Sequence, residues 1–299
     1  MSKTYKVGGH AFSVVTDSDF VSCLLETMDN YAPFLCDGND GDMLFSVNIS
    51  VENDIFSKLD GVKLLAEFDD DIAYIALMED SCHDVVFRMA LNRKYSESGG
   101  ILKINKDSRS ACLYLNGKAE YNHQTFIINN SLMLMYAMFS STLDTLLIHA
   151  SVVVNSNKGY AFLGRSGTGK STHTGLWLNH IEGSVLLNDD NPVVRILSDG
   201  KTVIYGSPWS GKTPCYKNQG VELRSIVRLS QAPYNRIKQL KGVAAYVALS
   251  PSASSMRWDN EIADGLHRTV SELIYVVGIY HLECLPDEDA AWVCFNAVK

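Results

Sequence analysis

Hydrophobic and polar residues alternate along much of the first 125 positions. In the segment LFSVNISV, Phe45, Val47 and Ile49 alternate with serine and asparagine, which is the period of a half-buried strand. The segments IAYIALM and DVVFRMAL are similar, and the turn-like EDSCHD separates them. Further turn signals follow at SESGG and NGK. The pattern predicts a β-rich N-terminal domain over residues 1–125, whose role the pattern does not indicate.

The pattern changes near residue 130, where NSLMLMYAMFSSTLDT has helical spacing and Asn130 or Ser131 can cap its start. The run LLIHASVVV then predicts a strand, SNKG a turn and YAFL a second strand. SVLLNDD predicts a further strand, and PVVRI with VIYGS predicts a hairpin. The last 39 residues, from EIADG onward, are typical of a helix, a strand and a helix that begins near Pro286 and Asp287. We therefore expect an α/β fold, α+β overall, with a second domain over residues 126–299.

Composition and charge narrow the class of protein. The formal net charge of −8 argues against nucleic acid or an anionic membrane as the main partner. No apolar run is long or uninterrupted enough to predict a signal peptide or a membrane span. The seven cysteines are odd in number and form no C-x-x-C pair, which predicts reduced thiols in a cytoplasm and no structural zinc site.

Residues 164–171, GRSGTGKS, match the phosphate-binding pattern G-x-x-x-x-G-K-[ST] in full. Backbone N–H groups must turn inward onto a phosphate, and glycine allows both the close approach and the positive φ angles. A strand precedes the loop and a helix follows it, so the phosphate would meet a helix N-terminus. Lys170 would contact the β- and γ-phosphates, and the Ser171 hydroxyl would ligate Mg²⁺. The predicted nucleotide-binding residues are Gly164, Arg165, Ser166, Gly167, Thr168, Gly169, Lys170, Ser171 and Thr172.

Two aspartates end the strand that follows the predicted helix. In an α/β sheet the end of VLLNDD would lie beside the glycine loop, so Asp189 could bind the metal that holds the phosphates. A nucleoside triphosphatase needs only one such acid, whereas a second carboxylate, Asp190, can accept a proton from an attacking hydroxyl. The pair therefore favours phosphoryl transfer to a hydroxyl over a mechanical ATPase.

The segment YGSPWSGKTPCYKN raises a second candidate contact. Ser210, Gly211 and Lys212 could bind another phosphate or a carboxylate, and Trp209 could stack on a ligand. The alternative is a surface loop that contains a buried tryptophan. This segment is not a second phosphate-binding loop, because no upstream glycine lies at the required offset.

The stretches LLIHASVVVNSNKGYAFLGRSGTGKSTHTGLW, LLNDDNPVVRI and VELRSIVRL together resemble the catalytic domain of the HPr kinase/phosphorylase family. The resemblance covers about residues 144–230, and the order of histidine, loop, Asp-Asp and Glu is its most specific feature. It implies a PEP-carboxykinase-like P-loop domain with a mixed sheet and flanking helices. It also implies an ATP- and Mg²⁺-dependent kinase that phosphorylates a serine hydroxyl.

The resemblance assigns roles to individual residues. His149 matches the family's histidine on the strand before the loop, and Lys170 and Ser171 match its lysine and metal-binding hydroxyl. Asp190 matches the proton acceptor. Glu222, in VELRS, matches a second metal-binding acid. From the residues alone, His149 could equally be a buried strand histidine and Glu222 an ordinary strand glutamate.

The resemblance leaves several alternatives open. The family's later catalytic arginine could correspond to Arg236, Arg257 or Arg268, so a reverse, phosphorolytic activity is not assigned. The N-terminal region does not match the family's usual N-terminal domain, and the whole chain looks more like HPr-kinase-like proteins of bacterial genomes. The acceptor could then be a carrier protein, a peptide or a small molecule, and a homo-oligomer is one expected state. The other functions considered are a non-catalytic nucleotide-binding regulatory module and a PEP-carboxykinase-like enzyme.

Overall fold

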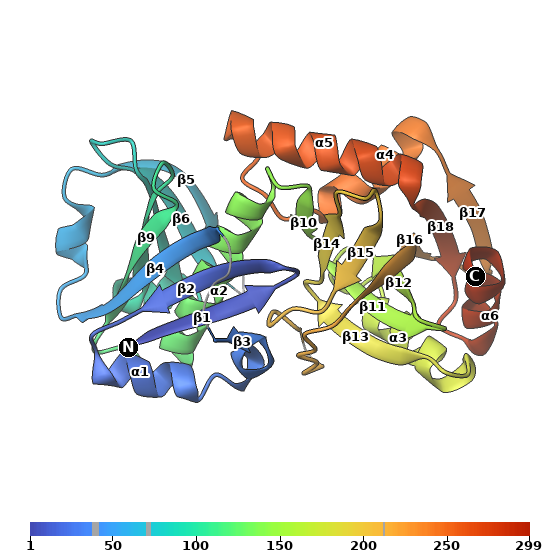
Figure 1. The fold of residues 1–299 in the computed structure, drawn as a ribbon, viewed down its shortest axis with the longest axis horizontal. Coiled ribbons are helices and arrows are strands. Elements are labelled where there is room, and N and C mark those ends of the chain that lie inside the picture. The colour runs from blue at the N-terminus through green and yellow to red at the C-terminus, as the bar shows by residue number, and fades with distance from the viewer. Residues whose placement is uncertain (38–41, 70–72, 212) are drawn as a thin grey trace. The chain divides into compact units, whose positions relative to one another are not determined.

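Among the described residues, two nine-stranded mixed sheets with helices form the framework of the computed structural model (Figure 1). The structure describes residues 1–37, 42–69, 73–211 and 213–299. The chain divides into two compact units, the first made of Met1–Lys6 and His10–Tyr136, the second of Val7–Gly9 and Ala137–Lys299. Among the described residues, no helix is long and apolar enough to cross a membrane.

The first unit is built on a sheet with both parallel and antiparallel neighbours. In spatial order its strands are β3 (Leu35–Cys36), β1 (Ser2–Val7), β2 (His10–Val15), β4 (Met43–Glu52), β9 (Ser110–Asn116), β8 (Gly100–Asn105), β7 (Val85–Ala90), β6 (Tyr74–Glu79) and β5 (Lys63–Asp69). The helical elements are α1 (Asp19–Glu26), η1 (Asp29–Phe34), η2 (Phe56–Leu59), η3 (Arg93–Ser98) and α2 (Tyr121–Ser140). The alternation predicted in β4 is confirmed, because Phe45, Val47 and Ile49 are buried.

The long helix α2 begins nine residues before the predicted start, at Tyr121 rather than Asn130. Its first turns are held by Gln124, whose side-chain amide donates to the carbonyls of Asn116 and Ala119. They also pack against the sheet, because a Cβ on Gly100 of β8 would come within 2.5 Å of Ile127 Cγ2. Tertiary packing thus extends the helix into a segment that carries no strong apolar periodicity.

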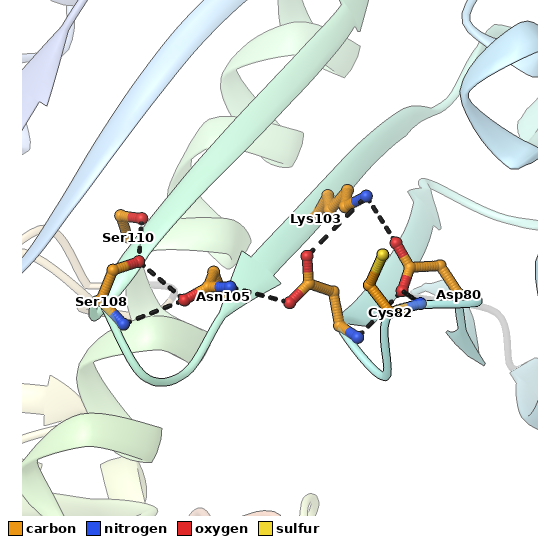
Figure 2. A network of polar contacts seen from close by, with 7 residues as sticks. Asp80, Cys82, Lys103, Asn105, Ser108 and Ser110 are labelled. Atoms are coloured by element: carbon orange, nitrogen blue, oxygen red, sulfur yellow. Dashed lines mark hydrogen bonds and ion pairs between the residues drawn. The ribbon is translucent and has the colours of Figure 1, made fainter.

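Figure 2 shows how polar side chains fix two neighbouring hairpin turns of this sheet. Asp80 Oδ1 accepts the backbone N–H groups of Cys82 and Asp84 across the predicted EDSCHD turn. Lys103, from the adjacent β8, lies 2.5 Å from the Asp80 carboxylate, and this contact lowers the pKa of Asp80. Asn105 then bonds Asp84, which links this turn to the one between β8 and β9.

The second unit is built on a sheet whose two faces carry different helices (Figure 1). Its strands are β10 (Thr145–Leu147), β14 (Val193–Ile196), β15 (Thr202–Tyr205), β16 (Gly220–Gln231), β12 (Lys158–Leu163), β11 (Ala150–Asn155) and β13 (Val185–Asp190), while β18 (Gly278–Cys284) pairs with β16 and with β17 (Arg236–Leu240). The helices are α3 (Lys170–His180), α4 (Gly242–Leu249), η4 (Ser250–Ser252), α5 (Asn260–Val276) and α6 (Glu288–Val298).

Among the described residues, a different hydrophobic core lies under the helices on each face of this sheet. Ala248 of α4 and Leu266 and Val270 of α5 pack with Ile226 of β16 on one face. Trp177 of α3, the C-cap residue Ile181 and Cys294 of α6 pack on the other face, with Val227 and Leu229 as their partners from β16. The mixed α/β expectation holds for this unit, as do the predicted β14–β15 hairpin and the C-terminal helix, strand and helix.

Candidate functional site

The glycine loop joins the end of β12 to the start of α3, which is the context that a phosphate-binding loop requires. Gly167 and Gly169 have φ angles of 78° and 108°, which residues other than glycine rarely adopt. Gly169 is the N-cap of α3 and supplies no side-chain hydrogen bond. The backbone N–H groups of the first helical turn have no partner within the helix, so they could donate hydrogen bonds to an anion held by the loop.

The run expected to form one strand before the loop is two strands, and His149 lies between them. β10 ends at Leu147 and β11 begins at Ala150. The break arises because the backbone N–H of His149 bonds the carbonyl of Ser252, and that of Ile148 bonds Pro192. His149 therefore leaves the sheet ladder at the end where the loop begins, and its ring is free to contact side chains.

Lys170 and Asp190 meet on opposite sides of the His149 ring. Lys170 Nζ lies 2.8 Å from His149 Nε2 and donates to the Gly164 carbonyl at 3.0 Å. His149 Nδ1 lies 2.9 Å from Asp190 Oδ1. With Nδ1–H donating to the carboxylate, Nε2 is left to accept from the ammonium group. Burial lowers the pKa of Lys170, while the charges of Asp190 and Asp189 act in the opposite direction.

Asp189 and Ser171 form the second pair of the site. Ser171 Oγ donates to both Asp189 carboxylate oxygens, at 3.1 and 3.2 Å. Asp189 is 6% exposed and lies one residue before the end of β13, beside Ser151 of β11. A hydroxyl and a carboxylate oxygen are hard donors that suit Mg²⁺, which takes few protein ligands and completes its shell with water and phosphate. Among the described residues, no group of three or more His, Cys, Asp or Glu side chains is placed to hold a metal ion.

Residues 209–211 form a crossing segment that lies against the end of β13, where the two aspartates are. Gly211 N–H donates to the Asp189 carbonyl at 2.8 Å, and a Cβ at this position would come within 2.7 Å of that oxygen. Ser210 pairs with Asp190 in an isolated bridge. Glycine is therefore needed for close backbone approach. Trp209 is only 2% exposed, which agrees with the alternative of a buried tryptophan rather than with a ring that stacks on a ligand. The predicted contact of Lys212 lies outside the described residues.

Among the described residues, Glu222 is a candidate that lies away from the loop. It is paired with Lys158, the first residue of β12, whereas the loop follows the last residue, Leu163. Since the two strands are parallel, Glu222 lies at the opposite end of the sheet, roughly 15–20 Å along the strand at about 3.3 Å per residue. Its carboxylate is 2.5 Å from Lys158 Nζ. Of the three predicted metal ligands, the structure therefore brings only Ser171 and Asp189 together among the described residues.

The three candidate arginines are all engaged elsewhere. Arg236 bonds Glu283, and Arg268 bonds Asp144 and the carbonyl of Thr142. Arg257 donates to the carbonyls of Ser250 and Ala253 and so fixes the η4 turn. None of these contacts is with the loop or with the aspartates.

Among the described residues, the loop lines a cavity on each face of the sheet. The α4-side cavity has a volume of about 560 Å³ and is lined by His149, Gly164, Arg165, Ser166, Gly167, Thr168, Arg228, Leu229, Ser230, Gln231, Ala248, Pro251 and Ser252. The α3-side cavity has a volume of about 550 Å³ and is lined by Gly167, Thr168, Gly169, Thr172, His173, Leu176, Leu229, Gln231, Ala232, Cys284, Leu285 and Pro286. The first is lined by several charged and polar side chains, and the second is more apolar.

The end of β16 lies beside the loop, which no sequence motif indicates. Leu163, the last residue before the loop, pairs with Arg228, so residues 228–231 run alongside the loop. The Gln231 amide lies within 3.4–3.5 Å of the carbonyls of Gly167 and Thr168. The available signal was VRLSQ, in which polar residues interrupt an apolar strand near its end.

Comparison with known proteins does not show a family for this chain. No family model and no curated protein matches the chain. Among solved structures, a match is the HPr(Ser) kinase/phosphatase from Coxiella burnetii, at 12% sequence identity and a TM-score of 0.28. The match covers 50% of this chain and 95% of that chain. Likeness at this level does not support an argument about function.

Proposed function

We propose that this protein is a Mg²⁺- and ATP-dependent phosphotransferase that moves a γ-phosphoryl group to a hydroxyl of its acceptor. The observation that carries the proposal is that the glycine loop and the start of α3 are linked to two neighbouring aspartates, each through a different side chain. Ser171 contacts Asp189, while Asp190 is linked through His149 to Lys170. An HPr-kinase-like enzyme with a PEP-carboxykinase-like catalytic unit over residues 126–299 is the form of the proposal that agrees with the sequence.

The nucleotide would span the loop. The loop amides and the N-terminus of α3 would hold the phosphates, with Lys170 neutralising their charge. Ser171 and Asp189 would hold Mg²⁺, which screens the phosphate oxygens. The base and ribose would lie in the α3-side cavity, where Leu176, Leu229 and Leu285 supply apolar surface.

Asp190 is proposed as the proton acceptor. The acceptor oxygen forms a bond to the γ-phosphorus, the bond from that phosphorus to the β–γ bridging oxygen breaks, and ADP leaves with the electron pair. The hydroxyl proton goes to Asp190. His149 Nδ1–H fixes one carboxylate oxygen, and the Asn191 side-chain amide donates to the other at 2.9 Å. These contacts orient the carboxylate before the acceptor arrives.

Asp190→Asn tests the proposal. The variant keeps the side-chain size but not the basic oxygen, so we expect ATP affinity within a few-fold of wild type and phosphoryl transfer reduced by about 10²–10⁴-fold. The measurement pairs ATP titration with label transfer from γ-labelled ATP in cell extract. Asp199→Asn, in the β14–β15 turn, is the matched control and should behave as wild type. Wild-type protein that binds ATP and labels nothing would instead support the regulatory module.

A further inference from the structure

A row of basic side chains leads out of the α4-side cavity across the end of the sheet. In the register of the sheet, Arg228 of β16 lies opposite His281 of β18, and His281 lies opposite Lys238 of β17. Side chains alternate between the faces of a strand, and Ile226 belongs to the core beneath α4 and α5. Arg228 and its cross-strand neighbours therefore lie on the α4 face, on the side of the cavity.

The charge of this row is not compensated. Among the described residues, neither Arg228 nor Lys238 forms an ion pair, and the nearby Glu283 is already paired with Arg236 at 2.7 Å. Burial lowers the pKa of His281, and the charges of Lys238, Arg228 and Arg236 lower it further, whereas Glu283 acts against them. A chain with a net charge of −8 thus keeps a local positive site beside its phosphate loop.

The lining of the cavity is suited to a polar occupant. Arg165 enters it from the loop and Arg228 from the strand, and Ser230, held at 2.8 Å by His281, adds a hydroxyl. His149, the partner of Asp190, lines the same cavity. A volume of about 560 Å³ is within the range of small-molecule sites, roughly 300–1,000 Å³.

We infer that the α4-side cavity is the acceptor site, and that Arg228 selects a small molecule with a carboxylate or phosphate group near the hydroxyl that is phosphorylated. This inference rests on the proposed function and adds the class of its substrate. Arg228 would bind the anionic group in the ground state, while the hydroxyl is presented to the γ-phosphorus and to Asp190. The bonds that form and break are those given above, with no further reactant.

The test divides a cell extract by ultrafiltration, then divides the small-molecule filtrate on an anion exchanger. Each fraction is incubated with wild-type protein, Mg²⁺ and γ-labelled ATP. We expect label to enter compounds of the anion-retained filtrate. Transfer only to polypeptides, or only to unretained neutral compounds, overturns the inference while the proposed function stands. A wild-type protein that fails to bind ATP instead contradicts the proposed function.

Variants of Arg228 then test the role of the charge. With the active fraction, Arg228→Gln should raise the half-saturating amount of acceptor about tenfold or more with an unchanged ATP Kd, and Arg228→Lys should restore part of the loss. Arg224→Gln is the matched control, because Arg224 lies on the same strand and bonds the Lys299 carbonyl. A lower maximal rate at unchanged half-saturation would show that Arg228 acts on the transferring phosphate, and would overturn the inference.

Discussion

At the scale of single residues, the site depends on one histidine, His149, which lies in the break between β10 and β11. His149 is held by a backbone bond to Ser252, and its ring joins Lys170 to Asp190. The sequence indicated the loop, the two aspartates and the histidine as candidates, because each carries a local motif or a family pattern. The sequence could not indicate that His149 contacts both Lys170 and Asp190, since these contacts depend on the break between β10 and β11.

Gly211 is a residue whose role follows from backbone approach alone. Because a Cβ there would meet the Asp189 carbonyl at 2.7 Å, Gly211→Ala must displace the end of β13 or the crossing segment. We expect phosphoryl transfer to fall by about 10- to 100-fold, as misplacement of a reacting group does. Steady-state transfer and thermal unfolding are the measurements.

The control is a glycine with free space around it. Gly175 of α3 has nothing within 4 Å of its ideal Cβ, so Gly175→Ala should keep transfer and stabilise the helix by about 0.5–1 kcal/mol. Equal transfer by the two alanine variants would contradict the role assigned to Gly211.

At the scale of elements, the parallel pairing of β12 with β16 decides what lies near the loop. It places Arg228 beside Leu163 and Glu222 at the far end. The sequence predicted most strands and helices of this unit from their apolar periods, but not the order of the strands. Without that order, the resemblance alone assigns Glu222 to the site, and no sequence motif indicates that Arg228 lies beside the loop.

Helix α3 joins the loop to the core through a buried histidine. His173 Nε2 accepts from Trp177 Nε1 at 3.1 Å, and its ring packs against Phe162. Burial lowers the pKa of His173 from 6.5 to about 4. Between these values the unfolded chain binds the proton and the folded chain does not, so folding stability falls as the pH falls from 6.5 to 4.

The expected loss from this group is up to about 3 kcal/mol, complete near pH 4 and absent above pH 6.5. His173→Gln retains an acceptor for Trp177 but cannot titrate, so its unfolding free energy should vary less over this interval. Urea unfolding of both proteins at pH 7 and near pH 4.5 measures the difference. Identical pH dependence would show that His173 does not contribute.

At the scale of the whole molecule, both units are built on mixed sheets, and the described site residues belong to the second. Among the described residues, all seven cysteines are thiols rather than members of disulfides. Cys23 and Cys82 are exposed, whereas Cys215 and Cys294 are buried, and burial raises the pKa of both buried thiols. Since the thiolate is the reactive form, the buried pair should react slowly.

Thiol labelling of the native chain therefore has a predicted order. Cys23 and Cys82 should be modified first, and Cys215 and Cys294 only on unfolding, when all seven become reactive. Time-resolved alkylation followed by peptide mass analysis measures this order. Rapid modification of Cys294 in the native protein would contradict the packing of α6 on the sheet.

The central claim is that the glycine loop binds the phosphates of a nucleotide through Lys170, and one titration tests it most directly. Calorimetric binding of ATP in the presence of Mg²⁺ is measured for wild type and for Lys170→Met, which keeps the length of the side chain without its charge. We predict that wild type binds and that the variant binds at least about tenfold more weakly, a loss of about 1.4 kcal/mol. Equal affinity, or no binding by the folded wild-type protein, would contradict the account.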